Sequence, residues 1–406
     1  MVVRLLSTMS PRNPDEPHRA STPLELFFDL TFVVAVAQAS STMHHLLVDG
    51  HGRDALVGYP LVFFGIWWAW MNFTWFASAY DTDDALYRVM VFVQMAGVLV
   101  FAAGVPRFLT DLDASVAVVG YVIMRLGAVP QWLRAAVQHP EGRTCALRYA
   151  FGITVCQVCW IVLLLAPDGW WVPGFIAVAA LELAVPAWAE RDAPTSWHPG
   201  HIGERYGLFT ILVLGESVLS ATAAMETALD EGGPFSDLVT TATGGFLVVA
   251  AMWWIYFDQP VERLLTRARD AFSARDEALS FVWGYGHYFV FASAAAVGVG
   301  LAVAVDQAVG HSTLTDLQAA FVLTCPVVLY LLTVWVLHFR FKQRGPLRSY
   351  ACPLTAAVVL ATSWTGEPVL LTGLALGALV VTSLVLNRHG AGEATDALEA
   401  PADASS

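Results

Sequence analysis

The sequence predicts an all-α integral membrane protein with about twelve transmembrane helices. Of its 406 residues, 57% are hydrophobic and only 14% are charged, whereas soluble domains carry about 25% charged residues. The mean hydropathy is +0.59. Long apolar runs recur along the whole chain between polar breaks. Because a chain in lipid must close its backbone hydrogen bonds internally, these runs predict a helical bundle.

The apolar runs give the positions of the expected helices. A hydrocarbon layer of about 30 Å takes about 20 helical residues. Runs near that length lie at residues 24–47, 57–79, 85–105, 115–137, 146–166, 170–189, 204–226, 236–257, 279–304, 316–338, 350–365 and 367–387. Only Thr365–Pro368 separates the last two runs, so they form either two spans or one re-entrant pair.

The two halves of the chain carry similar features in the same order. Residues 25–31 align with residues 204–210 through a leading Glu and a later Thr. The next run of each half contains a double Trp, and the third run begins with Asp-Asp-Ala-Leu in one half and Asp-Glu-Ala-Leu in the other. This order predicts parallel internal repeats of six helices each. Chance similarity between apolar helices is the alternative.

Polar segments flank the predicted halves, which cover residues 23–190 and 204–387. Residues 1–22 form a polar N-terminal segment, and residues 191–203 link the halves. Residues 388–406 are rich in Ala, Gly, Asp and Glu, a composition that predicts a disordered acidic tail.

Basic residues predict the orientation in the membrane. With the N-terminus in the cytoplasm, seventeen Arg and Lys residues fall on the cytoplasmic side, against Arg53 and Arg107 on the opposite side. This bias predicts a multi-pass inner membrane protein with both termini in the cytoplasm. The formal charge of −13 comes from acids in loops and in the tail, so it gives no reason to expect a nucleic-acid partner.

The run at residues 204–226 contains charged residues that would lie deep in the membrane. Glu216 lies about halfway along it, and Arg205 lies eleven residues earlier on the same stripe of a helix. A carboxylate near the middle of a bilayer costs several kcal/mol unless it is protonated, paired or hydrated, so Glu216 is a functional candidate.

The first run carries two more carboxylates, Glu25 and Asp29, at positions i and i+4. Both therefore face one way, with Asp29 about a turn and a half inside the membrane. They form either a proton or cation site in the bundle interior or an interfacial pair bonded to Arg or backbone groups.

Three further polar residues lie within apolar runs: Arg125, Glu182 and His287. Arg125 cannot lose its charge and needs a carboxylate partner, for which Asp29, Glu182 and Glu216 are the candidates. The Arg125 pair either holds the bundle together or senses substrate or proton state. His287 either relays protons, given its ordinary pKa of about 6.5, or is a hydrogen-bonded core residue.

Three acids cluster in the loop before the third run: Asp81, Asp83 and Asp84. Such a cluster can hold Mg²⁺ on a diphosphate substrate. It can equally cap the following helix, whose N-terminus favours negative charge. The cap is the favoured interpretation, because no other loop offers a catalytic constellation.

Four segments together resemble the bacterial low temperature requirement protein A (LtrA) family. They are residues 25–38 (ELFFDLTFVVAVAQ), Tyr80–Asp84 with Arg88, residues 204–217 (ERYGLFTILVLGES) and Tyr285–His287. The resemblance covers about residues 20–388. It implies a multi-pass membrane protein and supplies no catalytic residue set.

These observations lead us to expect a secondary transporter or ion-conducting protein, proton-coupled and without a cofactor. Buried titratable groups, two halves and little extramembrane mass support this expectation. Asp29, Arg125, Glu216 and His287 would surround one central cavity, with Glu216 carrying the proton and Arg125 as counter-charge.

The expected partners are membrane lipids and an unknown small solute or ion, with a homo-oligomer as one arrangement. The alternatives are a non-catalytic component of cold or stress adaptation and a Mg-dependent transferase on a lipid-linked substrate.

Overall fold

The computed structural model describes residues 5–13, 16, 19–167, 169–192, 195–258, 274–339 and 346–399. All regular secondary structure in these ranges is helical. The helices are α1 (Pro23–Val48), α2 (Gly52–Tyr80), α3 (Ala85–Asp111), α4 (Ser115–Gln138), α5 (Arg143–Leu163), α6 (Trp171–Ala189), α7 (Pro199–Asp230), α8 (Phe235–Phe257), α10 (Ala274–Val309), α11 (Asp316–Val334), the π-helix η1 (Trp335–Phe339), α12 (Pro346–Thr362) and α13 (Pro368–Glu399).

Within the described residues, eleven helices are long and apolar enough to cross a membrane. They correspond to eleven of the twelve predicted runs. The run at residues 350–365 is the exception, because its helix α12 has only 17 residues and counts as a shorter apolar helix. The protein is therefore an all-α, multi-pass membrane protein.

Two predictions concern segments that lie partly outside the described residues. α13 continues to Glu399, into the segment whose composition predicts a disordered tail, and residues 400–406 lie outside the described set. Several basic residues that contribute to the predicted orientation, among them Arg4, Arg263 and Lys342, also lie outside it.

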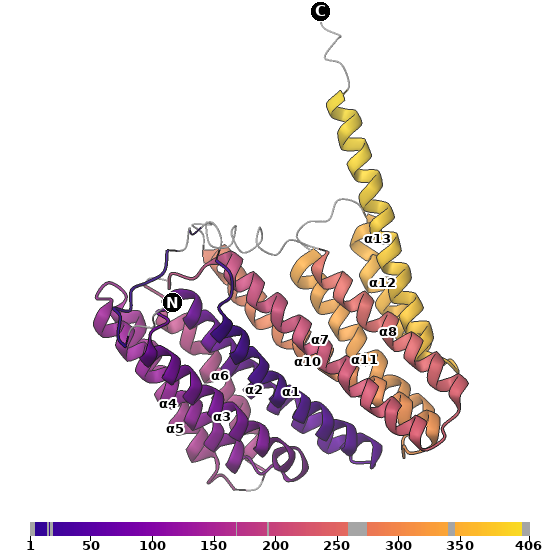
Figure 1. Ribbon diagram of the computed structural model, residues 1–406, viewed down its shortest axis with the longest axis horizontal. Helices are drawn as coiled ribbons and strands as arrows, with labels where there is room; N and C mark the ends of the chain where they lie inside the picture. The colour runs from indigo at the N-terminus through magenta and orange to yellow at the C-terminus, as the bar shows by residue number, and fades with distance from the viewer. Residues whose placement is uncertain are drawn as a thin grey trace, which may run out of the picture. The chain divides into compact units, whose positions relative to one another are not determined.

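The helices pack into two compact units. Unit 1 comprises residues Met1–Glu216 and Val261–Gly284, and unit 2 comprises Ser217–Pro260 and Tyr285–Ser406. In unit 1, α3 packs against α4 and α1, and α4, α5 and α6 follow one another as neighbours. In unit 2, α8 packs against α13, and α11 contacts α12 (Figure 1). The unit boundary falls within α7, and unit 2 begins at Ser217, thirteen residues after the predicted start of the second half at residue 204.

Local sequence signals explain where two helices of unit 1, α1 and α3, begin. Thr22 caps α1 in a reciprocal arrangement with Glu25, and Pro23 occupies the first turn. Asp84 caps α3 by accepting a hydrogen bond from the Tyr87 backbone N–H at 2.8 Å. The prediction that this acid caps the third helix is confirmed.

Candidate functional site

The candidate site lies where α1 packs against the first half of α7, inside unit 1. Each helix begins with Pro, and each carries polar residues at its third and seventh positions. In α1 these residues are Glu25 and Asp29, and in α7 they are His201 and Arg205. Because residues i and i+4 share a helix face, both pairs are presented toward the facing helix.

The outer layer of this site joins Glu25 to His201. The two side chains are buried, and His201 Nε2 lies 3.0 Å from Glu25 Oε1. The other carboxylate oxygen of Glu25 accepts a 2.7 Å hydrogen bond from the Thr22 backbone N–H. The capping geometry of α1 therefore orients the carboxylate toward the imidazole.

The next layer, one turn further in, joins Asp29 to Arg205. Arg205 Nη2 donates to Asp29 Oδ1 at 2.7 Å, and both side chains have zero exposure. Trp70 of α2 donates its indole N–H to the same oxygen, also at 2.7 Å. Asp29 Oδ2 and the Arg205 atoms Nε and Nη1 have no hydrogen-bond partner among the described residues. The pair is therefore tightly held but incompletely satisfied.

A third polar contact lies deeper along the same two helices. Ser40 Oγ donates to Glu216 Oε2 at 3.3 Å. Ser40 and Glu216 are 176 residues apart, as are Asp29 and Arg205, and Glu25 and His201 show the same separation. A constant separation means that α1 and α7 run parallel and in register. Arg205 and Glu216 both face α1, which confirms the predicted stripe.

An apolar layer separates Asp29–Arg205 from Ser40–Glu216. Asp29 and Ser40 are eleven residues apart, or about 16 Å along a helix. Phe32 and Val36 of α1 and Phe209 and Val213 of α7 lie between these two polar layers along their helices, and all four are fully buried. The Trp70 ring stacks on Phe209 with centroids 4.4 Å apart. We call this arrangement of polar and apolar layers the α1–α7 seam.

Arg125 takes Glu182 as its partner, one of the three candidates. Arg125 Nη2 lies 3.7 Å from Glu182 Oε1, and the Tyr121 hydroxyl donates to Glu182 Oε2 at 2.8 Å. Arg125 also donates to the Tyr121 hydroxyl and lies over the Tyr121 ring. Asp29 instead pairs with Arg205, so these two buried arginines have separate carboxylate partners.

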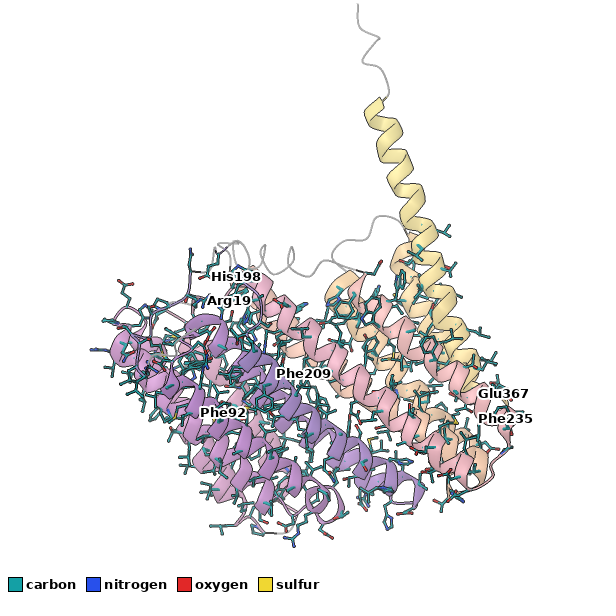
Figure 2. All side chains as sticks on the ribbon, viewed as in Figure 1. Arg19, Phe92, His198, Phe209, Phe235 and Glu367 are labelled. Carbon is teal, nitrogen blue, oxygen red and sulfur yellow. The ribbon has the colours of Figure 1, made fainter. Side chains whose placement is uncertain are left out.

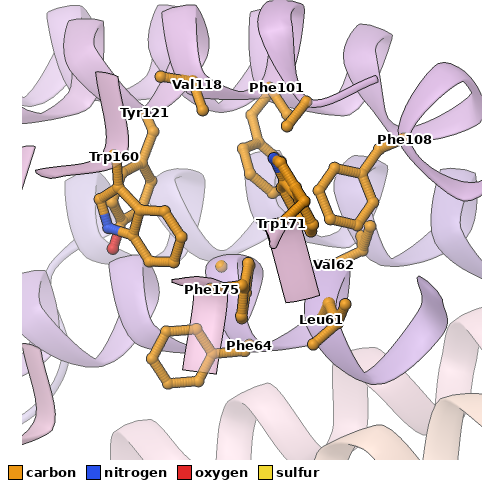
Figure 3. Close-up of a pocket in the computed structure, with 13 residues that line it drawn as sticks. Leu61, Val62, Phe64, Phe101, Phe108, Val118, Tyr121, Trp160, Trp171 and Phe175 are labelled. Carbon is orange, nitrogen blue, oxygen red and sulfur yellow. The ribbon is translucent and has the colours of Figure 1, made fainter. Parts of the chain in front are cut away.

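A small cavity adjoins this second pair. Tyr121 and Trp160 lie at one end of it, and Phe108 and Trp171 lie toward the other (Figure 3). It offers water-sized molecules about 40 Å³, and its thirteen lining residues include no charged side chain. Because no charged side chain lines it, the cavity adds no further charge to the Arg125–Glu182 pair, which agrees with a structural ion pair.

His287 belongs to unit 2, where it contacts two polar aromatic residues. Its Nε2 lies 3.0 Å from the Tyr256 hydroxyl. The His338 ring, in the π-helix η1, lies 5.8 Å from the His287 ring and 5.1 Å from the Tyr256 ring between centroids. The predicted grouping of His287 with Asp29 stays a prediction, since the two residues belong to different units.

Each acid of the loop after α2 has a basic neighbour. Arg12 Nη1 lies 3.7 Å from Asp81, Arg88 makes two hydrogen bonds to Asp83 at 2.7 and 2.8 Å, and Arg134 Nη2 lies 2.5 Å from Asp84. Within the described residues, no group of three or more His, Cys, Asp and Glu side chains could hold a metal ion. The contacts favour the capping role of this loop over the metal-dependent alternative.

Two residues of the site, His201 and Trp70, are not among those predicted to form it. His201 stands four residues before Arg205, the same spacing as Glu25 and Asp29. That repeated spacing at the start of two apolar runs is a signal that could have identified it. Trp70 could not be separated from the many other Trp residues by pattern alone.

Comparison with known proteins supports the membrane assignment. A curated protein from Rhizobium meliloti (strain 1021), described as uncharacterized, is 29% identical over 293 residues, which cover 66% of this chain. The matched part spans about two thirds of that relative, 65% of its length. No solved structure matches the chain.

The family model described as bacterial low temperature requirement A protein (LtrA) matches residues 20–386. The chain therefore belongs to the LtrA family.

Proposed function

We propose that this protein is a proton-coupled secondary transporter or ion-conducting protein, and that its protons bind along the α1–α7 seam. The observation that carries the proposal is the constant register of α1 and α7, which lines up three polar layers along one helix pair. Titratable residues within membrane helices are costly, and they commonly mark ion or proton pathways.

The charges of the two outer layers suit a proton or a small cation. Two carboxylates, Glu25 and Asp29, face one permanently charged guanidinium, Arg205. The imidazole of His201 supplies the remaining positive charge only when it is protonated. The group is therefore neutral with one proton on His201 and carries one negative charge without it.

Unsatisfied polar atoms support hydration of these layers. Asp29 Oδ2, Arg205 Nε and Nη1, His201 Nδ1 and the Tyr87 hydroxyl are all buried without a hydrogen-bond partner among the described residues. Buried polar groups in proteins are nearly always satisfied, by water where protein atoms are absent. Water or a polar solute in this region would satisfy several of them at once.

The fully buried stretch from Phe32 and Phe209 to Val36 and Val213 then acts as the barrier between two polar regions. Protons reaching Asp29 from one side and Glu216 from the other would cross this barrier only when the helices rearrange, as alternating access requires. The Arg and Lys distribution places the Glu25 end in the cytoplasm.

Purified protein in liposomes containing a pH-sensitive dye tests the proposal. An imposed pH gradient, with the membrane potential clamped, should produce faster internal pH change than in protein-free liposomes. Asp29→Asn and Glu216→Gln should reduce the rate to the protein-free level, because each removes a titratable group from the seam.

Matched substitutions of exposed acids serve as controls. Asp54 and Glu141 are exposed, so Asp54→Asn and Glu141→Gln should conduct like the wild type. A Glu216→Gln variant with undiminished flux would remove that residue from the pathway. Wild-type flux equal to that of protein-free liposomes would contradict proton conduction along the seam in the absence of a solute.

A further inference from the structure

The N-terminal segment lies across one end of the unit 1 bundle. We call its described residues, 5–13, 16 and 19–22, the N-terminal strap. The Ser7 backbone N–H donates to Asp84 Oδ2 at 2.8 Å, at the start of α3. The Met9 backbone N–H donates to Gln138 Oε1 at 2.6 Å, at the end of α4, and Met9 is fully buried. The strap thus touches the ends of helices far apart in sequence.

Arg19 fastens the strap to the C-terminal end of α2. Its guanidinium donates to the backbone carbonyl of Ala77 at 2.6 Å and to that of Ser78, and the residue is only 7% exposed. The Arg12 backbone N–H donates to the Ala79 carbonyl at 2.9 Å. The last carbonyls of a helix lack intrahelical partners and carry partial negative charge, so a buried cation there is favourable.

The strap also reaches the start of α7. His198 Nε2 lies 2.8 Å from the Glu16 carbonyl oxygen, and the Ser21 backbone N–H lies 3.3 Å from Glu204 Oε1. Arg19 and His198 are seen at the same end of unit 1 in Figure 2. The strap therefore contacts the helix ends that surround the Glu25–His201 layer.

We propose that the N-terminal strap is a gate over this end of the α1–α7 seam, and that protonation of Asp81 holds the gate shut. The inference rests on the proposed function, since a gate requires a path to close. Asp81 ends α2 directly beneath the strap, with its side chain only 6% exposed.

Asp81 is surrounded by charges of both signs. Glu25 of α1 and Asp83 of the loop face it as acids, Arg12 and Arg19 of the strap face it as bases, and Tyr87 of α3 is also close. Burial, reinforced by Glu25, raises the pKa of Asp81 to about 6, although Arg19 and Arg12 act in the opposite direction.

The direction of this shift determines which state a proton favours. Opening of the strap would hydrate Asp81 and would also remove Arg12 and Arg19 from its surroundings. Because burial is the largest of these effects, the pKa of Asp81 would fall toward its ordinary value of about 3.9. The closed state therefore binds the proton more tightly than the open state, so protonation stabilises closure. Between about pH 5 and about pH 7.5 the strap should change from closed toward open.

Accessibility of a thiol beneath the strap tests this gate without measuring flux. Ser78 is fully buried and its carbonyl binds Arg19, so Ser78→Cys is a nearly isosteric probe in a background without the native cysteines. Its labelling by a small, charged thiosulfonate is measured relative to Glu141→Cys, an exposed site that corrects for the pH dependence of the reagent.

The normalised labelling rate should rise between about pH 5 and about pH 7.5. Adding Asp81→Asn, which mimics the protonated side chain, should keep labelling slow at both pH values. The matched control Asp54→Asn should retain the wild-type response, because Asp54 is exposed and lies in the first turn of α2, at the other end of that helix from Asp81. A rate that does not change with pH, or that still rises in Asp81→Asn, would overturn the gate.

Hydrogen exchange of the wild-type protein gives a second measurement that needs no substitution. The backbone N–H groups of Ser7, Met9 and Arg12 are bonded to other elements in the closed state. Their protection, corrected for intrinsic exchange, should fall together as pH rises through about 6. Unchanged protection would contradict strap opening, whereas loss of proton flux with normal strap opening would count against the proposed function alone.

Discussion

The Asp29–Arg205 pair is a fully buried ion pair, so losing one partner should have a large energetic consequence. Removing one partner of a buried ion pair leaves an uncompensated charge, which costs about 3–5 kcal/mol. Asp29→Asn should therefore lower the free energy of unfolding by about that amount. Denaturant unfolding in detergent micelles measures the change, with exposed Asp54→Asn expected within about 0.5 kcal/mol of the wild type.

A double substitution separates the pair's stability from its function. Asp29→Leu with Arg205→Met replaces both charges by apolar groups of similar size, which is often neutral or stabilising for buried pairs. The double variant should recover most of the stability that Asp29→Asn loses, while still lacking proton flux. Equal stability losses in both variants would argue against an uncompensated charge as the cause.

Asp84 gives a second, opposite response of the strap to acid. Burial raises the pKa of Asp84, but hydrogen bonds from Arg134, Tyr87 and Ser7 together hold it below its ordinary value. The stabilisation is therefore present above the unfolded pKa of about 3.9 and is lost as pH falls through the lower folded value.

The strap's protection against exchange should consequently pass through a maximum, between the acid loss at Asp84 and the loss near pH 6 at Asp81. Hydrogen exchange at Ser7 across this range measures the profile. Asp84→Asn should abolish the loss of protection at low pH and leave the loss of protection near pH 6 unchanged. A single monotonic profile in the wild type would contradict this assignment of the two acids.

The sequence predicted which side chains of the site share a face, but only part of how they pair. Glu25 and Asp29 both face α7, as their i, i+4 spacing predicts. Their partners lie 176 residues away in the chain, and no periodicity within one helix specifies such a contact. Arg125 shows the same limit, because the need for a carboxylate left three candidates and packing decided for Glu182.

Close packing of α3 against α4 depends on glycine. A Cβ atom on Gly120 would lie 2.3 Å from the Phe101 backbone nitrogen and 2.6 Å from the Gly97 carbonyl oxygen. Such distances force the helices apart, so Gly120→Ala should destabilise the protein by about 1–3 kcal/mol. Thermal unfolding in micelles measures the effect.

Gly377 in α13 provides the matched control. Among the described residues, no heavy atom of another element lies within 4 Å of the Cβ position at Gly377, so Gly377→Ala should be neutral or stabilising by up to about 1 kcal/mol. A Gly120→Ala variant as stable as Gly377→Ala would mean that α3 and α4 are not closely packed there.

Hydrophobic run length predicted the helices well, with one instructive exception. The run at residues 350–365 suggested a span, but its helix is shorter than the other eleven. Hydropathy alone reports which residues avoid water, and it does not determine how many of them one helix contains. The predicted runs begin where the helices begin both with a side-chain cap, as at Asp84 before α3, and without one, as at Ser115 of α4.

At the scale of the whole molecule, the orientation prediction can be tested with exposed loop residues. Ser115 at the start of α4 and Glu141 after its end are both exposed. In a background without native cysteines, Ser115→Cys should react with a membrane-impermeant maleimide in intact cells. Glu141→Cys should react only after permeabilisation, because the distribution of basic residues predicts that its end of the bundle lies in the cytoplasm. The reverse pattern would invert the orientation.

The protonation of the seam carboxylates is the measurement that tests the central claim most directly. Infrared difference spectra of the reconstituted protein, recorded while pH is changed, should contain a carbonyl band from protonated carboxyl groups. Subtracting the spectra of Asp29→Asn and Glu216→Gln should assign part of that band to each residue. A band that changes with pH and is lost in these variants is the predicted result, whereas a band unaffected by either substitution would contradict proton binding along the α1–α7 seam.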